Sequence, residues 1–166
     1  MTSFRHKKSV PRILCDANIE DTAHWLRAAG YDVYVSFVNL SDEQLLKMAL
    51  KENRVLLIRK QDTVSMSNSN ETVIILDSEF LFDQIKQIGQ HLAIDWLYKP
   101  LSRCMICNTQ LQKLNINMWL DLPAEIHDNT ETSHACPSCK RIYWAGEQID
   151  KMVGQLQLFK DSQHQH

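Results

Sequence analysis

The chain has 166 residues, enough for one sizeable hydrophobic core and a small additional module, and 44% of them are hydrophobic and 23% charged, as in ordinary soluble globular proteins. A formal net charge of -2 excludes a surface that is basic overall, so any surface for nucleic acid must be local. No apolar run is long enough for a signal peptide or a transmembrane helix, which predicts a cytoplasmic protein without membrane contact.

Short apolar runs alternate with helical patterns in the first part of the chain. The runs at residues 13–15 and 55–58 are unbroken, as in strands that are buried on both faces of a sheet. The predicted strands cover residues 13–15, 32–36, 54–58 and 72–76. Apolar residues between these strands recur at helical spacing, and the alternation predicts an α/β fold with a parallel sheet flanked by helices on both faces.

Polar residues and glycine indicate where these helices begin and end. Gly30 supplies the left-handed residue that ends the first helix. The expected N-terminal caps are Asn18, then Ser41 in a capping box with Gln44, and then Asp77 or Ser78. A further helical pattern covers residues 147–159, and we expect it to dock on the main domain, a second chain being the alternative.

Two Cys-x-x-Cys pairs lie in the second part of the chain, Cys104 with Cys107 and Cys136 with Cys139. The gap of two residues lets a tight turn direct both sulfurs to one point, and four thiolates bind Zn²⁺ in a tetrahedral array. Binding would supply folding free energy on the order of 10 kcal/mol near neutral pH, which the few nearby hydrophobic residues cannot. A closed four-thiolate site has no open coordination position, so we expect this zinc to be structural.

Redox activity and disulfide bonds are the alternative roles of these cysteines. Two such pairs in an apparently intracellular chain favour a structural metal over both. The 28 residues from 108 to 135 exceed the spacing of the commonest zinc ribbons, so a hairpin or an insertion must separate the pairs. The fifth cysteine, Cys15, lies in an apolar run and is expected to be a small core residue.

Carboxylates follow the predicted strands. Parallel strands all end at one edge of the sheet, and ligands bind in the crevice outside that edge. The carboxylates expected there are Asp16, Asp42, Glu43, Asp62 and Asp77. Such a cluster suits Mg²⁺ or Mn²⁺, which can activate a water for phosphodiester hydrolysis. A first helical turn or a cap also explains Asp42, Glu43 and Asp77, whereas no capping role explains Asp16.

Several segments resemble a known family. They are Asp16 with Trp25-Leu26-Arg27-Ala28-Ala29-Gly30-Tyr31-Asp32, Ser41-Asp42-Glu43, and Arg54-Val55-Leu56-Leu57-Ile58-Arg59. These are similar to the PIN-like RNase domain family named from the C-terminal domain of the Mut-seven exoribonuclease. The cysteine pairs with Arg103, Asn108 and the run from Tyr143 to Gly146 resemble its appended zinc ribbon. The resemblance covers residues 12–146 and implies a PIN-like fold, a divalent-metal centre, single-stranded RNA as substrate and no nucleotide cofactor.

The resemblance places the two first metal-binding acids of the family on Asp16 and Asp42. The third element departs from the family, which reads Thr-Arg-Asp and then another Asp where this chain reads Ile58-Arg59-Lys60-Gln61-Asp62. Arg59 and Asp62 persist, so the predicted catalytic residues are Asp16, Asp42, Arg59 and Asp62. Lys60 puts an ammonium where a carboxylate is expected, and a unit charge at about 4 Å changes the interaction energy by several kcal/mol, enough to expel or replace a divalent ion.

Three functions follow from these features. The first is a metal-dependent endoribonuclease with a partly degenerate centre, and the second is a non-catalytic module that binds RNA or a protein. The ribbon would supply the binding surface with basic Lys99, Arg103, Lys113, Lys140 and Arg141 and with aromatic Trp119, Tyr143 and Trp144. For these rings we favour packing against the zinc site. The third is a toxin-like nuclease that a protein partner neutralises.

The expected organisation has four parts. Residues 1–10 form a flexible arm and residues 11–98 the PIN-like α/β domain. Residues 99–160 form the zinc-ribbon module with its C-terminal helix, and residues 161–166 a polar tail. Pro100 marks the boundary between the two folded parts.

Overall fold

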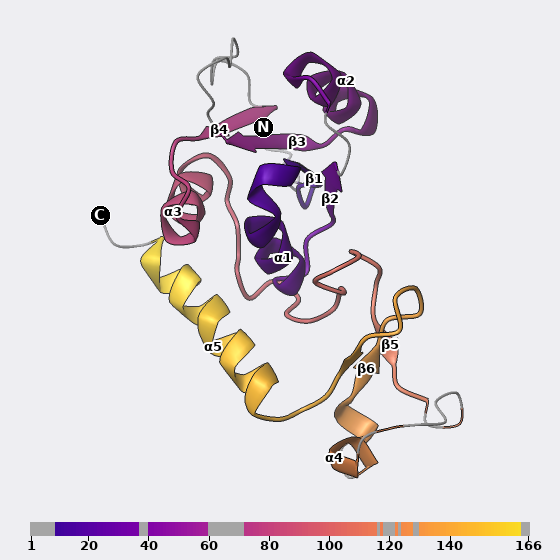
Figure 1. Cartoon of the computed structure of the whole chain (residues 1–166). Helices are drawn as coiled ribbons and strands as arrows, with labels where there is room; N and C mark the ends of the chain where they lie inside the picture. Colours follow the sequence, from indigo (N-terminus) through magenta and orange to yellow (C-terminus); the bar gives the residue numbers. More distant parts are fainter. Residues whose placement is uncertain are drawn as a thin grey trace, which may run out of the picture.

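A parallel four-stranded sheet is the centre of the protein (Figure 1). The computed structural model describes residues 9–36, 40–59, 72–115, 117, 122, 124–127 and 130–163. The strands are β1 (Ile13–Asp16), β2 (Val33–Ser36), β3 (Val55–Arg59) and β4 (Val73–Leu76), in the order β2-β1-β3-β4 with every neighbouring pair parallel. The predicted strands and their parallel arrangement are therefore confirmed, with each boundary within one residue.

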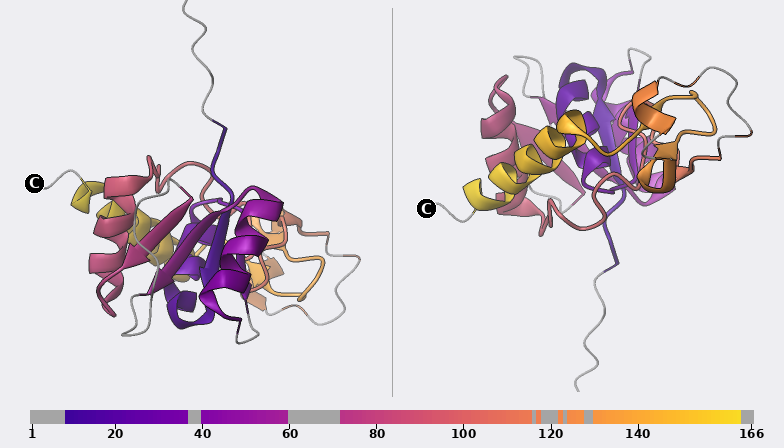
Figure 2. Two further views of the ribbon diagram at one scale, coloured as in Figure 1. Left: turned by 90° about the horizontal axis from the view of Figure 1, so that it is seen from above. Right: turned by 90° about the horizontal axis from the view of Figure 1, so that it is seen from below.

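Helices cover both faces of the sheet, as the two views of Figure 2 also show. The helix α2 (Asp42–Glu52) covers one face, and α1 (Glu20–Ala28), α3 (Leu81–His91) and α5 (Glu147–Ser162) lie on the other. No helix in the described part of the chain combines the length and the hydrophobicity needed to cross a bilayer. The prediction of an α/β fold with helices on both faces is confirmed.

Two hydrophobic clusters result because side chains alternate between the faces along each strand. Leu14 joins Leu45 and Ala49 of α2 in the smaller cluster, whereas Ile13 and Cys15 belong to the larger cluster under α1, α3 and α5. Cys15 is fully buried, and burial raises the pKa of its thiol to about 12, so it is a core residue as predicted.

The C-terminal helix α5 docks on the main core. Its Leu156 and Phe159 are fully buried. The Phe159 ring meets the rings of Trp25, Phe82 and Trp96 edge-on, with centroid distances of 5.4, 5.3 and 5.2 Å. The predicted docking of this helix on the main domain is confirmed.

The predicted caps have different outcomes. Ser41 and Gln44 form the capping box of α2. The predicted Asn18 cap is wrong, because a 3-10 turn at Ala17–Ile19 delays α1, and the Asn18 amide donates instead to the Asp16 carboxylate at 2.8 Å. The Asp77 or Ser78 cap is also wrong, because the Ser78 hydroxyl accepts from the Phe80 amide in a turn and Phe80 becomes the residue before α3.

Gly30 ends α1 with a left-handed φ of 103°, as predicted. The segment that leads to the cysteine pairs lies directly on this turn. The Lys99 amide donates to the Ala29 carbonyl at 3.0 Å, and the Leu101 amide donates to the Ala28 carbonyl at 2.7 Å. A Cβ on Gly30 would lie 2.6 Å from the Lys99 carbonyl oxygen and 2.7 Å from the Lys99 Cβ.

Gly30→Ala is therefore expected to lower the free energy of unfolding by about 2 kcal/mol, since the backbone strain adds to a displacement of the Lys99 segment. Chemical denaturation measures the effect. Gly154→Ala is the matched control, because nothing lies within 4 Å of its Cβ position in α5. The control should keep or raise stability, by up to ~1 kcal/mol. Equal stability of the two variants would contradict the close approach at Gly30.

The second part of the chain forms a small antiparallel sheet. Its strands are β5 (Gln112–Lys113), β6 (His134–Ala135) and β7 (Ile142–Tyr143), in that order. The segment between β5 and β6 contains α4 (Ala124–His127) and a 3-10 turn (Thr130–Thr132), so an insertion separates the two cysteine pairs as expected. Its small core consists of Leu114, Ile126 and Ala135, with Trp144 packed against it.

Candidate functional site

The two cysteine pairs lie in loops with the same backbone pattern. In the first, the Cys104 amide donates to the Thr109 carbonyl at 2.8 Å and the Asn108 amide to the Cys104 carbonyl at 3.0 Å. In the second, the Cys136 amide donates to the Arg141 carbonyl at 2.8 Å and the Lys140 amide to the Cys136 carbonyl at 3.1 Å. Asn108 and Lys140, each directly after the second cysteine, are left-handed with φ of 68° and 63°. Both loops therefore turn tightly enough to present two sulfurs each.

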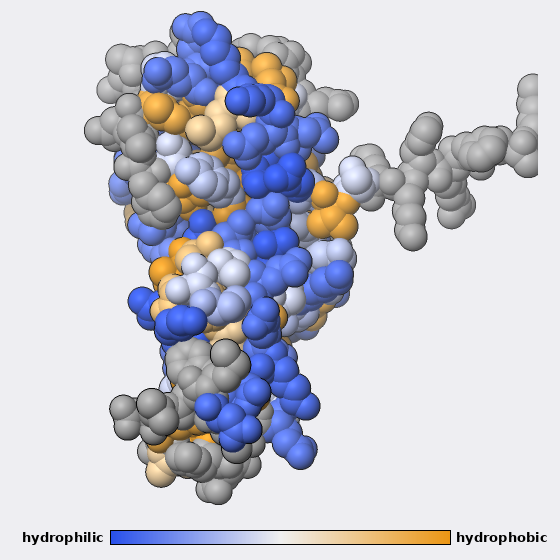
Figure 3. All heavy atoms as spheres, turned by 90° about the vertical axis from the view of Figure 1, so that its right-hand side faces the viewer, coloured by the Kyte–Doolittle hydropathy of each residue, from blue (hydrophilic) through white to orange (hydrophobic). Residues whose placement is uncertain are grey.

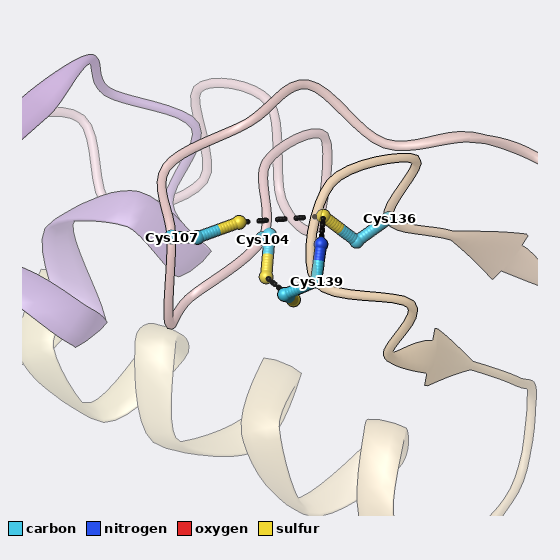
Figure 4. Close-up of side chains that lie close together, drawn as sticks. All are labelled: Cys104, Cys107, Cys136 and Cys139. Atoms are coloured by element: carbon cyan, nitrogen blue, oxygen red, sulfur yellow. Dashed lines mark hydrogen bonds between the residues drawn. The ribbon is translucent and has the colours of Figure 1, made fainter.

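The four sulfurs converge between these loops (Figure 4). All lie within 4.8 Å of one another, with 3.5 Å between the Cys104 and Cys139 sulfurs and 3.3 Å between the Cys107 and Cys136 sulfurs. A tetrahedral zinc with Zn–S bonds of about 2.3 Å needs sulfurs roughly 3.8 Å apart. The predicted ligands Cys104, Cys107, Cys136 and Cys139 are brought together, and the donor set fits a metal such as Zn²⁺.

The electrostatics of the cluster also favour a cation. Burial opposes ionisation of Cys107, but hydrogen bonding to Thr109 outweighs it and lowers the pKa of the Cys107 thiol to about 6. Burial and the neighbouring cysteine sulfurs raise the pKa of Cys139 to about 12. The thiols therefore cannot all ionise together without a compensating charge, and a divalent cation supplies it.

Of the aromatic residues of the ribbon, Tyr143 packs against the cysteine cluster as predicted. The Tyr143 hydroxyl lies 3.2 Å from the Cys104 sulfur and accepts from the Met105 amide at 3.2 Å. Trp144 packs against the small ribbon core. Trp119 lies outside the described residues. Tyr143 thus supports the metal centre, and Trp144 supports the hydrophobic core of the ribbon.

Arg27 and Asn108 join the first cysteine loop to the main sheet. Arg27 of α1 is 2% exposed and donates to the carbonyls of Val33, Met105 and Ile106 at 2.9, 3.0 and 2.7 Å. The Asn108 side chain accepts from the Val33 amide at 3.0 Å and donates to the Asp32 carboxylate at 2.8 Å. The metal centre and the edge strand β2 are therefore held together by buried polar contacts.

The sequence interpretation gave these two residues no role. Burial lowers the pKa of Arg27, yet its charge is compensated by the loop carbonyls and the neighbouring cysteines. In the sequence, the feature that indicates a buried role for Arg27 is its position four residues after Ala23, on the apolar stripe of the predicted helix. For Asn108 the signal was its position directly after the second cysteine of a pair, where a left-handed backbone favours Asn.

Arg27→Met is expected to lower the free energy of unfolding by about 3 kcal/mol, because three carbonyl groups lose a charged donor in a buried setting. Denaturant unfolding measures the loss. Arg141→Met, at an exposed position beside β7, is the control and should change stability by less than about 0.5 kcal/mol. Similar small changes in both variants would show that the Arg27 contacts contribute little.

Three of the other predicted residues, Asp16, Arg59 and Asp77, lie at the carboxyl edge of the parallel sheet. Asp16 is the last residue of β1 and pairs with Ser36 of β2, and Arg59 is the last residue of β3 and pairs with Leu76 of β4. Asp16 is half-buried. Asp77 directly follows β4 and is tied to α3 by hydrogen bonds with Gln87. The sheet thus brings Asp16, Arg59 and Asp77 to one edge.

Asp42 and Glu43, two further predicted carboxylates, lie in the first turn of a helix. Asp42 opens α2, which follows β2, and is half-buried; its neighbour Glu43 is exposed and pairs with Lys47 at 2.7 Å. Asp62 lies outside the described residues, as does Lys60. Within the described ranges, the four cysteines form the one group of three or more potential ligands close enough to share a metal.

Acidic residues that the sequence interpretation did not consider lie at the same edge. Glu20 and Asp21 form the first turn of α1, directly after the 3-10 turn that follows β1. Both side chains are exposed, and Glu20 lies 3.5 Å from His24 of the next turn. In the sequence, their position about one helical turn after the end of a predicted strand indicates that they lie near the carboxyl edge of the sheet.

Comparisons with known proteins identify one family. The model of a family described as "Mut7-C RNAse domain" matches residues 11–156, which include the sheet, the acidic edge and all four cysteines of the metal centre. No curated protein and no solved structure matches the chain.

Proposed function

The chain belongs to the Mut7-C RNAse domain family, and from this premise we propose that it is a divalent-metal-dependent endoribonuclease that cleaves single-stranded RNA. The observation that carries the proposal is the position of Asp16 at the carboxyl end of a central parallel strand, in a chain that the family model matches over residues 11–156. The Asp16 carboxylate does not cap α1, because no side chain accepts a capping hydrogen bond at the start of that helix. It is free to serve as a ligand for a hard cation.

The proposed roles divide the edge residues into two groups. Asp16, Asp42 and Asp62 would hold Mg²⁺ or Mn²⁺, which when bound supplies a Lewis acid and an activated water. Asn18 orients the Asp16 carboxylate through its 2.8 Å hydrogen bond. Arg59 would bind the scissile phosphate or pair with an acid, and its half-buried side chain at the end of β3 suits either task.

The metal centre has a structural part in this proposal. We assign Zn²⁺ to the four cysteines, where a closed thiolate set leaves no position for a substrate. The reduced thiolates that this site requires suit the cytoplasm. We keep the division of the chain into an RNase domain over residues 11–98 and a ribbon module over residues 99–160. The helix α5 of the module packs back on the core of the domain.

A second candidate function is a non-catalytic module that binds RNA or a protein partner. It is favoured by Ile58, which is 1% exposed and packs in the cluster under α2. The family has a threonine at this position, so the hydroxyl of that threonine is replaced here by an apolar core side chain. Lys60 adds an ammonium at the position of a carboxylate.

Cleavage assays with the wild type and Lys60→Asp distinguish the two functions. Each protein is mixed with end-labelled single-stranded RNA and Mg²⁺ or Mn²⁺, and the products are separated by length. We expect the wild type to cleave internally and Lys60→Asp to cleave faster, because an added carboxylate strengthens the cation site. Cleavage by Lys60→Asp alone would favour the non-catalytic module, and cleavage by neither protein would contradict the nuclease proposal.

A further inference from the structure

A cavity lies at the amino edge of the parallel sheet, opposite the acidic edge. Its volume is about 460 Å³, and Arg12, Asp32, Tyr98, Lys99, Arg103 and Gln110 are among its lining residues. Arg12 directly precedes β1 and Asp32 directly precedes β2, which fixes the cavity at the amino ends of these strands. It lies between the main domain and the start of the ribbon.

Positive charge predominates in this cavity although the chain as a whole carries a formal charge of -2. Three cationic side chains line the cavity, those of Arg12, Lys99 and Arg103, together with one carboxylate, that of Asp32. Both oxygens of Asp32 are already bound, by Arg12 at 3.2 Å, by Arg54 at 3.0 Å and by Asn108 at 2.8 Å. Burial opposes its ionisation, but these donors lower the pKa of Asp32 to about 2. The Asp32 charge is thus neutralised internally, and Lys99 and Arg103 are left for an anion.

An exposed aromatic ring adjoins these cations. Tyr98 is 36% exposed and lies against Tyr31, with 5.5 Å between the ring centroids. The Lys99 ammonium lies over the Tyr98 ring, 5.2 Å from its centroid. A base that stacks on this face must displace the flexible Lys99 side chain, whose ammonium can then bind the phosphate of the same nucleotide.

The walls of the cavity are held in place without a ligand. The Lys99 amide is bound to the end of α1, and the Ser102 hydroxyl donates to the Lys99 carbonyl at 2.8 Å. One nitrogen of Arg103 donates to the Asn108 carbonyl at 2.9 Å, which leaves its other donors for a ligand. Binding here therefore requires little ordering of the protein.

We propose that this cavity is an anchoring site for single-stranded RNA, in which Lys99 and Arg103 bind backbone phosphate and a base stacks on Tyr98. The inference rests on the proposed function for the class of substrate. A volume of about 460 Å³ exceeds what a lone phosphate needs, and the ring gives a base a partner that a free anion does not use. Figure 3 shows that the side of the molecule that carries the ribbon is mostly hydrophilic, with apolar patches between.

The anchor and the acidic edge lie at opposite ends of the strands. Four residues of β1 at about 3.3 Å each separate the two edges by about 13 Å, before the depth of either site is added. An RNA of one or two nucleotides cannot occupy both sites, whereas a longer strand can. The anchor would then favour long RNA and fix the distance between the held nucleotide and the cleaved bond.

Binding is tested with fluorescence anisotropy on a labelled RNA of about 16 nucleotides, within the range of single-strand site sizes. All proteins carry Asp16→Asn so that the RNA stays intact. We expect Lys99→Glu to weaken binding about tenfold and to lower the slope of log affinity against log salt by about 1. Tyr98→Ala is expected to weaken binding about tenfold with an unchanged salt slope. Lys86→Glu, at an exposed position on α3, is the matched control and should bind as its parent does.

Cleavage separates this inference from the proposed function. With Asp16 intact, Lys99→Glu should raise the KM for the long RNA about tenfold and leave kcat unchanged, while RNA of about 2 nucleotides is cut equally well by both proteins. If no protein cuts RNA, the nuclease proposal fails and the binding assay still tests the anchor. Binding that Lys99→Glu and Tyr98→Ala leave unchanged overturns the anchor, and so does an equal loss in Lys86→Glu.

Discussion

Asp16→Asn is expected to abolish cleavage of single-stranded RNA while the protein keeps its fold. The substitution preserves the shape of the side chain and removes the negative charge that would hold the divalent ion at the end of β1. A catalytic metal contributes several kcal/mol to the transition state. Because about 1.4 kcal/mol corresponds to a factor of ten, the rate should fall by at least roughly 100-fold.

The rate is measured with excess protein over labelled RNA at saturating Mg²⁺ or Mn²⁺. Asp150→Asn makes the same chemical change at an exposed position of α5 and should cleave as the wild type does. Thermal unfolding of each variant checks that the fold is kept. Equal cleavage by the wild type and Asp16→Asn would defeat the proposed function, and an equal loss in Asp150→Asn would show that the effect is not specific to the edge.

Loss of the ribbon metal should have the largest effect on stability. We expect a chelator, or Cys136→Ser, to unfold the ribbon, because Leu114, Ile126 and Ala135 are the buried members of its hydrophobic core among the residues that the structure describes. Metal binding in units of this kind contributes on the order of 10 kcal/mol near neutral pH. Arg27 and Asn108 connect the first cysteine loop to β2, so the loss should also lower the melting temperature of the main domain.

Metal content by mass spectrometry and thermal unfolding measure this effect together. Wild type should hold one zinc per chain, and Cys136→Ser should hold much less. Cys15→Ala is the matched control, since Cys15 is buried in the main core away from the cluster. It should keep the full zinc content although the cavity costs some stability. A Cys136→Ser protein with unchanged zinc and melting temperature would contradict the structural role of the centre.

The strands and the metal ligands were predictable because their signals are local. An unbroken apolar run such as Val55-Leu56-Leu57-Ile58 suits a strand buried on both faces, and β3 covers Val55–Arg59. A two-residue gap between cysteines fixes their geometry within one turn, whatever the rest of the chain does. Ser41 and Gln44 form a capping box for the same reason.

The wrong caps and the missed residues share a different cause. Asn18 has two possible partners nearby, the backbone amides at the start of the first helix and the Asp16 carboxylate. The sequence alone does not show which of them it binds, and in the folded chain it binds Asp16. Arg27 lies on the apolar stripe of its helix, which indicates burial, but its partners Met105 and Ile106 are far away in sequence and no local pattern reveals them. The acidic edge could be predicted in part. Parallel topology predicts that Asp16 and Arg59 share an edge, while the prediction for Asp62 lies outside the described residues.

The contact between Asn108 and Val33 has a consequence for self-association. β2 is the outermost strand on its side of the sheet, and an uncovered outer strand offers free amides and carbonyls to another copy of the chain. The Asn108 side chain of the ribbon accepts from the Val33 amide and Arg27 of α1 donates to the Val33 carbonyl, so both outward-facing backbone groups of Val33 are occupied and strand addition is opposed at this position. Without its metal the protein would lose the contact between Asn108 and Val33. We expect the metal-free protein to form β-rich aggregates rather than a stable, partly folded monomer.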